Sequence, residues 1–202
     1  NMGIKEYLEY DGFSYKFVPI SNRQRTSEVG FSDPDRLYHL MTEVYTWDAL
    51  SYPDYYADNQ HLYTFCGVLS QRGIFVNAAK EMIKAGWPER AVELLDKCQE
   101  AVPEGNYPLD MSYLGFANEL MVMDMIDLYY MLDEPEKASD LAVRFLDKMF
   151  QSVQFFFEFY DYAEKEFDRA KSIVLTVQDI AKDNADEAVV AYVDRNFDAL
   201  LE

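Results

Sequence analysis

The sequence predicts a mainly α fold, in which antiparallel helical hairpins follow a small N-terminal element of mixed α and β structure. Two observations lead to this prediction. From residue 34 onward, apolar side chains recur at the three-to-four-residue spacing of amphipathic helices. Short turns marked by glycine and proline then separate many of these segments, which places consecutive helices antiparallel. We therefore expect two regions, an N-terminal element over residues 1–33 and a helical domain over residues 34–202.

The composition is that of a folded protein with a strongly acidic surface. Of the 202 residues, 50% are hydrophobic and 16% aromatic, which excludes a disordered chain. The 18 basic and 37 acidic residues give a formal net charge of −19, so we expect neither nucleic acid nor an anionic membrane surface as a partner. The longest stretch without a charged side chain covers residues 59–71, which is shorter than the ~20 apolar residues of a membrane-spanning helix.

The first 33 residues fit two local structures. We prefer a short helix, based on the helical spacing of the apolar residues in 4–8, which ends at Gly12 and is followed by a strand over residues 13–18. In the alternative, the Asp-Gly pair at Gly12 forms a type I′ turn between strands over residues 7–10 and 13–18. Residues 26–31 are a candidate partner strand.

The helical domain begins with a clear start signal. Pro34 suits the first turn of a helix, either Ser32 or Asp33 can cap it, and an apolar face continues to about residue 46. Residues 47–59, which are rich in tyrosine and aspartate and contain Pro53, are predicted to form a loop.

Further helices are separated mostly by recognisable breakers. Gly86 ends one helix, Pro88 opens the next, and Pro103 terminates that one. The expected helices span residues 34–46, 61–85, 88–102, 111–132, 135–150, 152–165, 167–183 and 185–201.

Residues 72–103 resemble a tetratricopeptide repeat, a helical hairpin that stacks with its neighbours into an α-α superhelix. The matching residues are Phe75, Ala78, Ala79 and Met82 in the first helix, Gly86 in the turn, Ala91, Leu95 and Cys98 in the second helix, and Pro103 at the end. Small side chains at Ala79 and Ala91 allow the two helices to approach closely. The resemblance predicts a tetratricopeptide-like fold for the helical domain.

A weaker repeat is predicted over residues 119–150. Its matched alanine, Ala138, lies 47 residues after Ala91, whereas the usual period is 34. A third match that begins at Ala170 is weak, so we assign residues 152–202 to capping helices.

The order of segments also resembles one wider family. Residues 7–20, 25–31 and 91–98 are similar to the C-terminal tails of bacterial multi-spanning membrane proteins of unknown function that are related to protein O-mannosyltransferases. The resemblance implies a soluble domain on the extracytoplasmic, periplasmic side of a bacterial membrane. The family's catalytic acid lies in the membrane-embedded part, so the resemblance assigns no catalytic residue to this chain.

A tetratricopeptide stack binds partners on the concave surface that its first helices line. The positions expected to be exposed there are Val76, Asn77, Lys80, Ile83 and Lys84 in the first repeat, and Met123, Asp127, Tyr130 and Met131 in the second. The basic clamp that captures acidic peptide termini is not supported, because Val76 occupies a lysine position of that clamp. We expect instead an extended or helical protein segment, held by apolar and polar contacts.

No residue pattern predicts catalysis, a metal site or a cofactor. His39 and His61 have no second ligand at a suitable spacing, so we expect structural or surface roles. Cys66 and Cys98 lie on apolar helix faces and are expected to be buried thiols. The loop acids Asp54 and Asp58 are interpreted as solvated side chains.

Two clusters of aromatic residues have a wider range of interpretations. Tyr52, Tyr55, Tyr56 and Tyr63 surround the loop at Pro53. Phe155, Phe156, Phe157, Phe159, Tyr160 and Tyr162 cover nearly every side of one helix. We prefer core packing for the second cluster, and the alternative is an interface with a second copy or with a membrane-embedded part.

These observations predict a non-catalytic interaction or scaffold module, most simply the soluble C-terminal domain of a larger membrane protein. Its partner would be a protein or peptide, including the membrane-embedded part of its own chain. The alternative is an acceptor-binding accessory domain of a membrane glycosyltransferase whose catalytic part lies outside this chain. The third hypothesis is a free-standing cytoplasmic scaffold protein.

Overall fold

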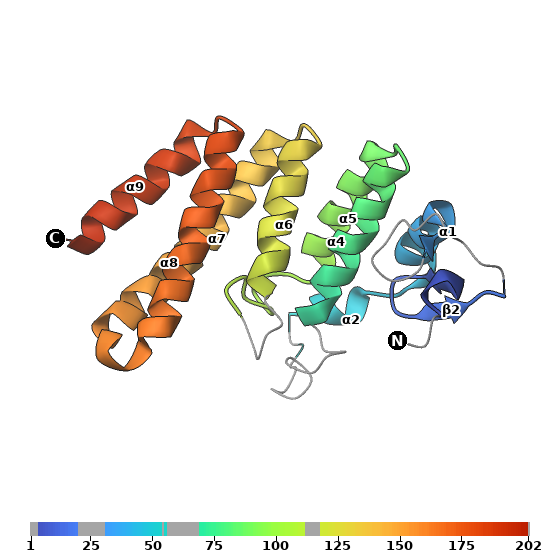
Figure 1. Cartoon of the computed structure of the whole chain (residues 1–202), viewed down its shortest axis with the longest axis horizontal. Helices are drawn as coiled ribbons and strands as arrows, with labels where there is room; N and C mark the ends of the chain where they lie inside the picture. The colour runs from blue at the N-terminus through green and yellow to red at the C-terminus, as the bar shows by residue number, and fades with distance from the viewer. Residues whose placement is uncertain (1–3, 20–30, 54, 56–68, 112–117, 202) are drawn as a thin grey trace. The chain divides into compact units, whose positions relative to one another are not determined.

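The computed structural model describes residues 4–19, 31–53, 55, 69–111 and 118–201, and they are mainly helical (Figure 1). The chain divides into two compact units, Asn1–Pro108 and Leu109–Glu202. The N-terminal sheet is grouped in the first unit with the helices that follow it, and the expected regions 1–33 and 34–202 stay a prediction from the sequence. Among the described helices, none combines the length and apolar composition that a bilayer span requires.

The first unit opens with a β-hairpin, so the preferred helix–strand reading of the N-terminus was wrong. After a 3-10 turn, η1 (Lys5–Tyr7), strand β1 (Leu8–Tyr10) pairs antiparallel with β2 (Tyr15–Phe17). Only Gly12 of the turn has a positive φ, +99°, so the turn is not the type I′ turn considered above, which needs a positive φ at both central residues. Aromatic pairs across the hairpin, at 5.4 Å and 5.9 Å between ring centroids, outweigh the helical spacing of residues 4–8.

A third strand, β3 (Phe31–Ser32), completes the sheet in the order β2-β1-β3 and runs parallel to β1. It overlaps the predicted partner strand at Phe31, whereas residues 26–30 lie outside the described part of the chain. Helix α1 (Pro34–His39) follows at once, and Asp33 caps it by accepting a hydrogen bond from the Arg36 amide at 3.1 Å.

The expected helix over residues 34–46 changes its hydrogen-bond pattern partway. Beyond α1, residues Leu40–Val44 form a π-helical turn, η2, closed by a bond from the Tyr45 amide to the Leu40 carbonyl. The predicted loop then contains a short helix, α2 (Asp48–Ser51), directly after the buried Trp47. Trp47 donates its indole N–H to the Met41 carbonyl at 2.9 Å, which ties this segment to the π-helical turn.

The hairpin predicted over residues 72–103 is present as α4 (Leu69–Lys84) and α5 (Pro88–Ala101). Every apolar position assigned to its two helices is fully buried: Phe75, Ala78, Ala79, Met82, Ala91, Leu95 and Cys98. Gly86 has the positive φ, +79°, that a glycine after a helix commonly adopts. The register of this hairpin is therefore confirmed, although residues 61–68 of the longer expected helix lie outside the described ranges.

In residues 109–111 and 118–201, the described part of the second unit, there are four helices: α6 (Asn118–Met131), α7 (Pro135–Glu158), α8 (Tyr160–Asp183) and α9 (Glu187–Leu201). The helix breaks predicted at residues 151 and 166 were wrong, because α7 continues to Glu158 and the chain reverses at Phe159 (Figure 1). Val153 is buried in this continuation, and Ala163 has non-helical angles early in α8. No glycine or proline marks this reversal in the sequence.

Three helical hairpins have the same turn. A residue with positive φ follows the first helix of each: Gly86, Asp133 and Ala185. In every case its amide bonds to the carbonyl three residues back, and the next amide bonds to the carbonyl five residues back. This is the hydrogen-bond pattern of a Schellman motif. Residues at the same sequence distance from the positive-φ residue of each turn are also buried in all three hairpins. The matched sets are Phe75, Val122 and Val174; Ala78, Met125 and Val177; Met82, Tyr129 and Ala181; and Leu94, Leu141 and Val193.

The helices α8 and α9, which we assigned to capping, thus form a hairpin equivalent to the first two. The weak third match begins at Ala170 in α8, the first helix of this hairpin, and its assignment as a tetratricopeptide repeat stays a prediction. Its turn residue is Ala185 where the first hairpin has Gly86, which is why the sequence pattern is faint.

Candidate functional site

The residues predicted to bind a partner through α4 are only partly exposed. Asn77 and Lys84 are exposed and Lys80 and Ile83 are half-buried, whereas Val76 is fully buried. Lys84 forms an ion pair with the buried Glu81 at 2.7 Å. Val76 therefore belongs to the core and was wrongly expected on the surface.

The predicted positions on α6 divide in the same way. Asp127 and Met131 are exposed, but Met123 and Tyr130 are buried. The Tyr130 hydroxyl donates a hydrogen bond to Asp186 at 2.8 Å. Burial raises the pKa of Tyr130, and this hydrogen bond raises it further. Because α4 and α6 belong to different compact units, a single binding face made from both stays a prediction.

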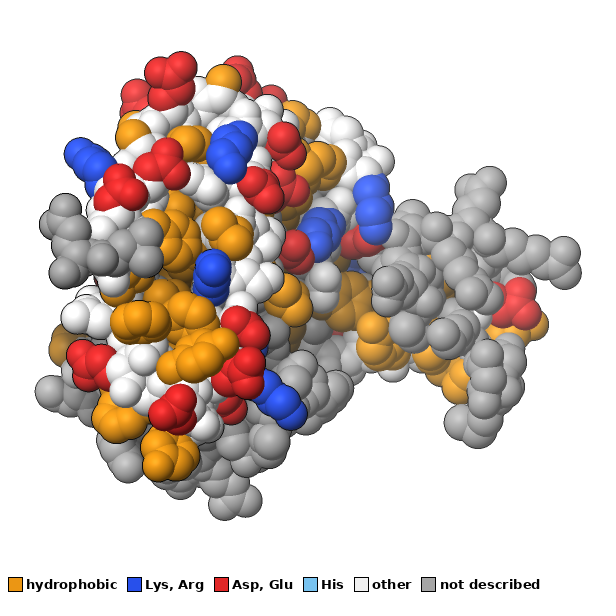
Figure 2. Space-filling view, turned by 60° about the vertical axis from the view of Figure 1, so that its left-hand side comes forward, with side chains coloured by type: hydrophobic (Ala, Val, Ile, Leu, Met, Phe, Trp, Pro, Cys, Tyr) orange, Lys and Arg blue, Asp and Glu red, His pale blue; other side chains and the backbone are white. Residues whose placement is uncertain are grey.

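The structure instead exposes the aromatic residues around the reversal between α7 and α8. We call five of them the aromatic tip; their exposed fractions are 56% for Phe155, 53% for Phe157, 48% for Phe159, 40% for Tyr160 and 93% for Tyr162. The preferred core-packing interpretation of this cluster was therefore wrong. On the face that Figure 2 brings forward, hydrophobic side chains gather in a patch, with acidic side chains and a few basic ones among and around them. Large contiguous apolar patches on a protein surface commonly mark interaction sites.

The rings of the aromatic tip support one another. Phe155 and Phe159 lie 5.1 Å apart between ring centroids, and Phe155 also packs edge-on against the half-buried Phe156 at 5.5 Å. On the α8 side, Tyr160 packs edge-on against Phe167 at 5.4 Å. These are favourable geometries for aromatic pairs, so the exposed rings have a defined arrangement before any partner binds.

The acidic residues of this segment lie between its aromatic residues. Glu158, Asp161 and Glu164 are all exposed, and the sequence has no lysine or arginine between Phe155 and Glu164. The Tyr160 hydroxyl donates to Glu164 at 3.4 Å, and the charge of that carboxylate raises the pKa of Tyr160. The aromatic tip is therefore both apolar and negatively charged.

An apolar groove adjoins the aromatic tip. Its volume is about 290 Å³, and it is lined by Val153, Phe157, Phe167, Lys171, Leu175, Phe197 and Leu200 from α7, α8 and α9. Phe157 belongs to both the tip and the groove, and its ring lies 5.9 Å from that of Phe167. We missed this groove in the sequence, although Phe167, Lys171 and Leu175 recur every four residues along one line of α8.

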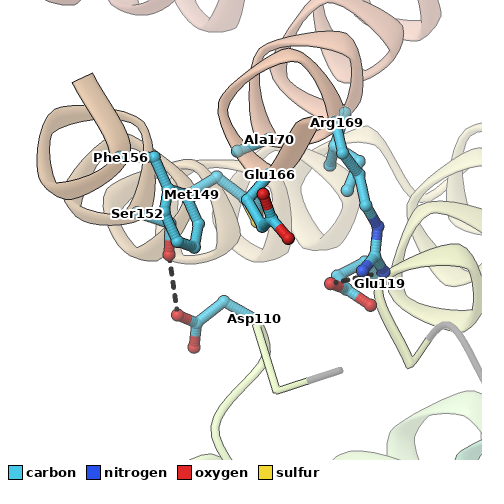
Figure 3. A pocket seen from close by; sticks show the side chains of 9 residues that line it. Asp110, Glu119, Met149, Ser152, Phe156, Glu166, Arg169 and Ala170 are labelled. Atoms are coloured by element: carbon cyan, nitrogen blue, oxygen red, sulfur yellow. Dashed lines mark hydrogen bonds and ion pairs between the residues drawn. The ribbon is translucent and has the colours of Figure 1, made fainter. Parts of the chain in front are cut away.

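A second cavity, of about 270 Å³, has a mixed polar and apolar lining (Figure 3). Its polar lining consists of Asp110, Glu119, Ser152, Glu166 and Arg169, and its apolar lining of Met149, Phe156, Ala170 and Ile173. Ser152 donates to Asp110 at 3.3 Å, and Arg169 forms an ion pair with the buried Glu119 at 3.1 Å. The first contact joins α7 to the segment at residue 110, and the second joins α8 to α6, so these polar groups hold parts of the second unit together.

Some of the remaining candidates from the sequence lie in the described part of the chain. His39 is exposed on α1, and Cys98 is fully buried in α5, where burial raises the pKa of its thiol to about 12. Tyr52 is exposed, and Tyr55 packs near Tyr107. The other candidates, Asp54, Tyr56, Asp58, His61, Tyr63 and Cys66, lie outside the described residues. Within the described ranges, no three or more His, Cys, Asp or Glu side chains are grouped in a way that could hold a metal ion.

Arg72 is a buried residue whose role sequence reasoning missed. Its guanidinium donates to the Val102 carbonyl at 3.1 Å and to the Tyr107 carbonyl at 2.5 Å, which anchors the segment after α5. Burial lowers the pKa of Arg72. A lone arginine near the start of a helix gives no sequence signal for such a contact.

Comparison of the chain with protein-family models, with curated proteins and with solved structures found no match. Membership of the tetratricopeptide family and the relation to membrane proteins of the O-mannosyltransferase type therefore stay predictions from the sequence.

Proposed function

We propose that this chain is a non-catalytic protein-interaction module. The observation that carries the proposal is the aromatic tip, in which five large aromatic side chains are 40–93% exposed at one helical reversal. Full burial of a large apolar side chain stabilises a protein by roughly 1.5–3 kcal/mol relative to full exposure. The exposed side chains of the aromatic tip lack part of that stabilisation until a partner covers them. Aromatic residues are also enriched in the centres of protein interfaces.

The proposed architecture is a tetratricopeptide-like stack. Support comes from the three hairpins that share one turn geometry and equivalent buried positions. Repeats of this kind bury their faces against neighbours and present extended binding surfaces. The exposed side chains of Asn77, Lys84, Asp127 and Met131 are the remaining candidates for a second contact region.

The proposed context is a domain of a larger membrane protein on its extracytoplasmic side. The support for it is the resemblance of residues 7–20, 25–31 and 91–98 to the tails of such proteins. In that context the partner is either a protein that accepts a sugar from a glycosyltransferase or the membrane-embedded part of the same chain.

Photo-crosslinking in the source cells tests the interaction. A photoreactive phenylalanine analogue replaces Tyr162 in one variant and Tyr52 in a matched control, because both tyrosines are exposed but only Tyr162 is in the aromatic tip. We expect a discrete heavier adduct from position 162 only. Adding excess wild-type chain should suppress that adduct, whereas the variant Phe155→Ser with Tyr162→Ser should not suppress it.

The proposal is contradicted if position 162 gives no adduct, or if both positions give the same adducts. Both serines replace exposed side chains, so the double variant should retain the circular dichroism spectrum and unfolding midpoint of the wild type.

A further inference from the structure

The aromatic tip has an excess of negative charge. Three exposed carboxylates, those of Glu158, Asp161 and Glu164, lie among its residues, whereas the first basic residue after Phe155 is the exposed Lys165. The whole chain has a formal net charge of −19. A surface of this kind attracts cations over distances of about 8–10 Å at ordinary salt concentrations.

Aromatic rings and carboxylates together recognise one type of side chain. The faces of tyrosine and phenylalanine attract ammonium and guanidinium groups, and carboxylates form ion pairs with the same groups. The hydrogen bond from Tyr160 to Glu164 holds a carboxylate beside a ring, so both interactions are offered at one place. Arginine suits such a site particularly well, because its planar guanidinium can stack on a ring and bind a carboxylate at once.

The adjacent groove adds a place for an apolar side chain. Its volume of about 290 Å³ is enclosed mainly by aromatic and aliphatic side chains, and Phe157 joins it to the tip. Among the lining residues that the structure describes, Lys171 is the one with a charge. This lysine would repel a cation there, which places the basic residues of a partner over the tip and its apolar residue in the groove.

We propose that the aromatic tip and the groove together bind a basic amphipathic segment of a partner protein, with arginine or lysine side chains over the tip and an apolar side chain in the groove. This inference rests on the proposed function and names the chemistry of its partner. The charge argues against the other occupants of an apolar face. A second copy would bring another net charge of −19 to the contact, and anionic lipid would be repelled by the tip carboxylates.

The test uses the whole chain and a fluorescein-labelled amphipathic peptide of arginine and leucine, with binding measured by fluorescence anisotropy. The comparison peptide has glutamate in place of arginine. One variant neutralises the tip by Glu158→Gln, Asp161→Asn and Glu164→Gln. The matched control neutralises three exposed acids near the opposite ends of α7, α8 and α9, by Glu136→Gln, Asp183→Asn and Glu187→Gln.

Both triple variants lose the same amount of net charge, so they separate local recognition from the field of the whole protein. We expect the arginine peptide to bind, neutralisation of the tip to weaken it about tenfold, and the control to change it less than about twofold. Equal weakening by both variants overturns the inference, and so does equal binding of the glutamate peptide.

Two further outcomes separate this inference from the proposed function. If excess wild-type chain suppresses the crosslinked adduct and the variant Phe155→Ser with Tyr162→Ser does not, but neutralisation of the tip does not weaken binding of the arginine peptide, the interaction module stands and the basic partner is wrong. If the chain binds phosphatidylcholine vesicles through the tip but not the arginine peptide, the occupant is a lipid surface and the inference is likewise wrong. If the wild-type chain gives no adduct and does not bind the arginine peptide, both proposals are contradicted.

Discussion

At the scale of single residues, Asp186 connects two helical hairpins of the second unit. It precedes α9 and accepts a hydrogen bond from the Val189 amide at 3.1 Å and one from the Tyr130 hydroxyl at 2.8 Å. Partial burial opposes ionisation of this carboxyl, but hydrogen bonds from Val189, Tyr130, Ser139 and Ala188 together hold its pKa below the usual value. The negative charge also lies at the N-terminus of a helix, where the backbone dipole favours it.

The substitution Asp186→Asn tests this contact through its pH dependence. Because the pKa is lowered in the folded state, the ionised carboxyl stabilises the fold above the usual carboxyl pKa, and this contribution is lost as pH falls through the folded pKa. We expect the variant to lose about 0.5–1 kcal/mol of unfolding free energy at neutral pH, since asparagine still caps but has no charge and solvent screens much of the effect. The difference should disappear on acidification.

Urea unfolding of both proteins, from neutral pH down to the acid transition, measures this difference. Asp183→Asn changes an exposed aspartate at the C-terminal end of α8 and is the matched control. A constant difference between wild type and Asp186→Asn at all pH values would contradict the predicted role of the charge.

At the scale of elements, the turn sequences explain both a success and a failure. Gly86 and Pro88 predict the α4–α5 turn, and the hairpin there has the predicted register. Asp133 and Ala185 adopt the same left-handed conformation without glycine, at a cost of the order of 1 kcal/mol that the packing of their hairpins offsets. The reversal at Phe159 has no breaker at all, so periodicity alone misplaced it.

The substitution Gln151→Pro tests whether the helix breaks at residue 151, as the sequence predicted, or continues through it, as in α7. Gln151 is exposed in the interior of α7, so Gln151→Pro should cost about 3 kcal/mol by removing a helix hydrogen bond and introducing a clash. If a new helix began near residue 152, the same proline would be tolerated in its first turn. Urea unfolding measures the cost, with Gln151→Ala as the control that keeps the helix. A cost near zero would restore the break that the sequence suggested.

At the scale of the whole molecule, the chain contains two compact units, and the second has a core of its own. Leu141, Phe145, Val174 and Val193 are buried among α6, α7, α8 and α9, which pack on one another. We expect residues 109–202 expressed alone to be helical by circular dichroism and to unfold cooperatively in urea. A broad, non-cooperative transition would show that this unit needs the first one in order to fold.

Much of the fold could be predicted from the sequence, whereas the candidate site largely could not. The apolar spacing that predicts α5 also places Ala91 and Cys98 in the core, and both are fully buried. The same reasoning put Val76 on the surface and the aromatic residues of α7 in the core, and both expectations were wrong. A hydrophobic side chain follows the same local pattern whether or not another helix covers it.

The sequence by itself determined the helical class, the register of the α4–α5 hairpin and the acidic character of the chain. These properties depend on periodicity, on the restricted angles of glycine and proline, and on charge, all of which act within a few residues or simply add up. Only the tertiary structure decided where α7 ends and that Phe155 and Tyr162 remain exposed. Burial depends on which distant segment covers a given face, and that is a property of packing across the unit and not of the local sequence.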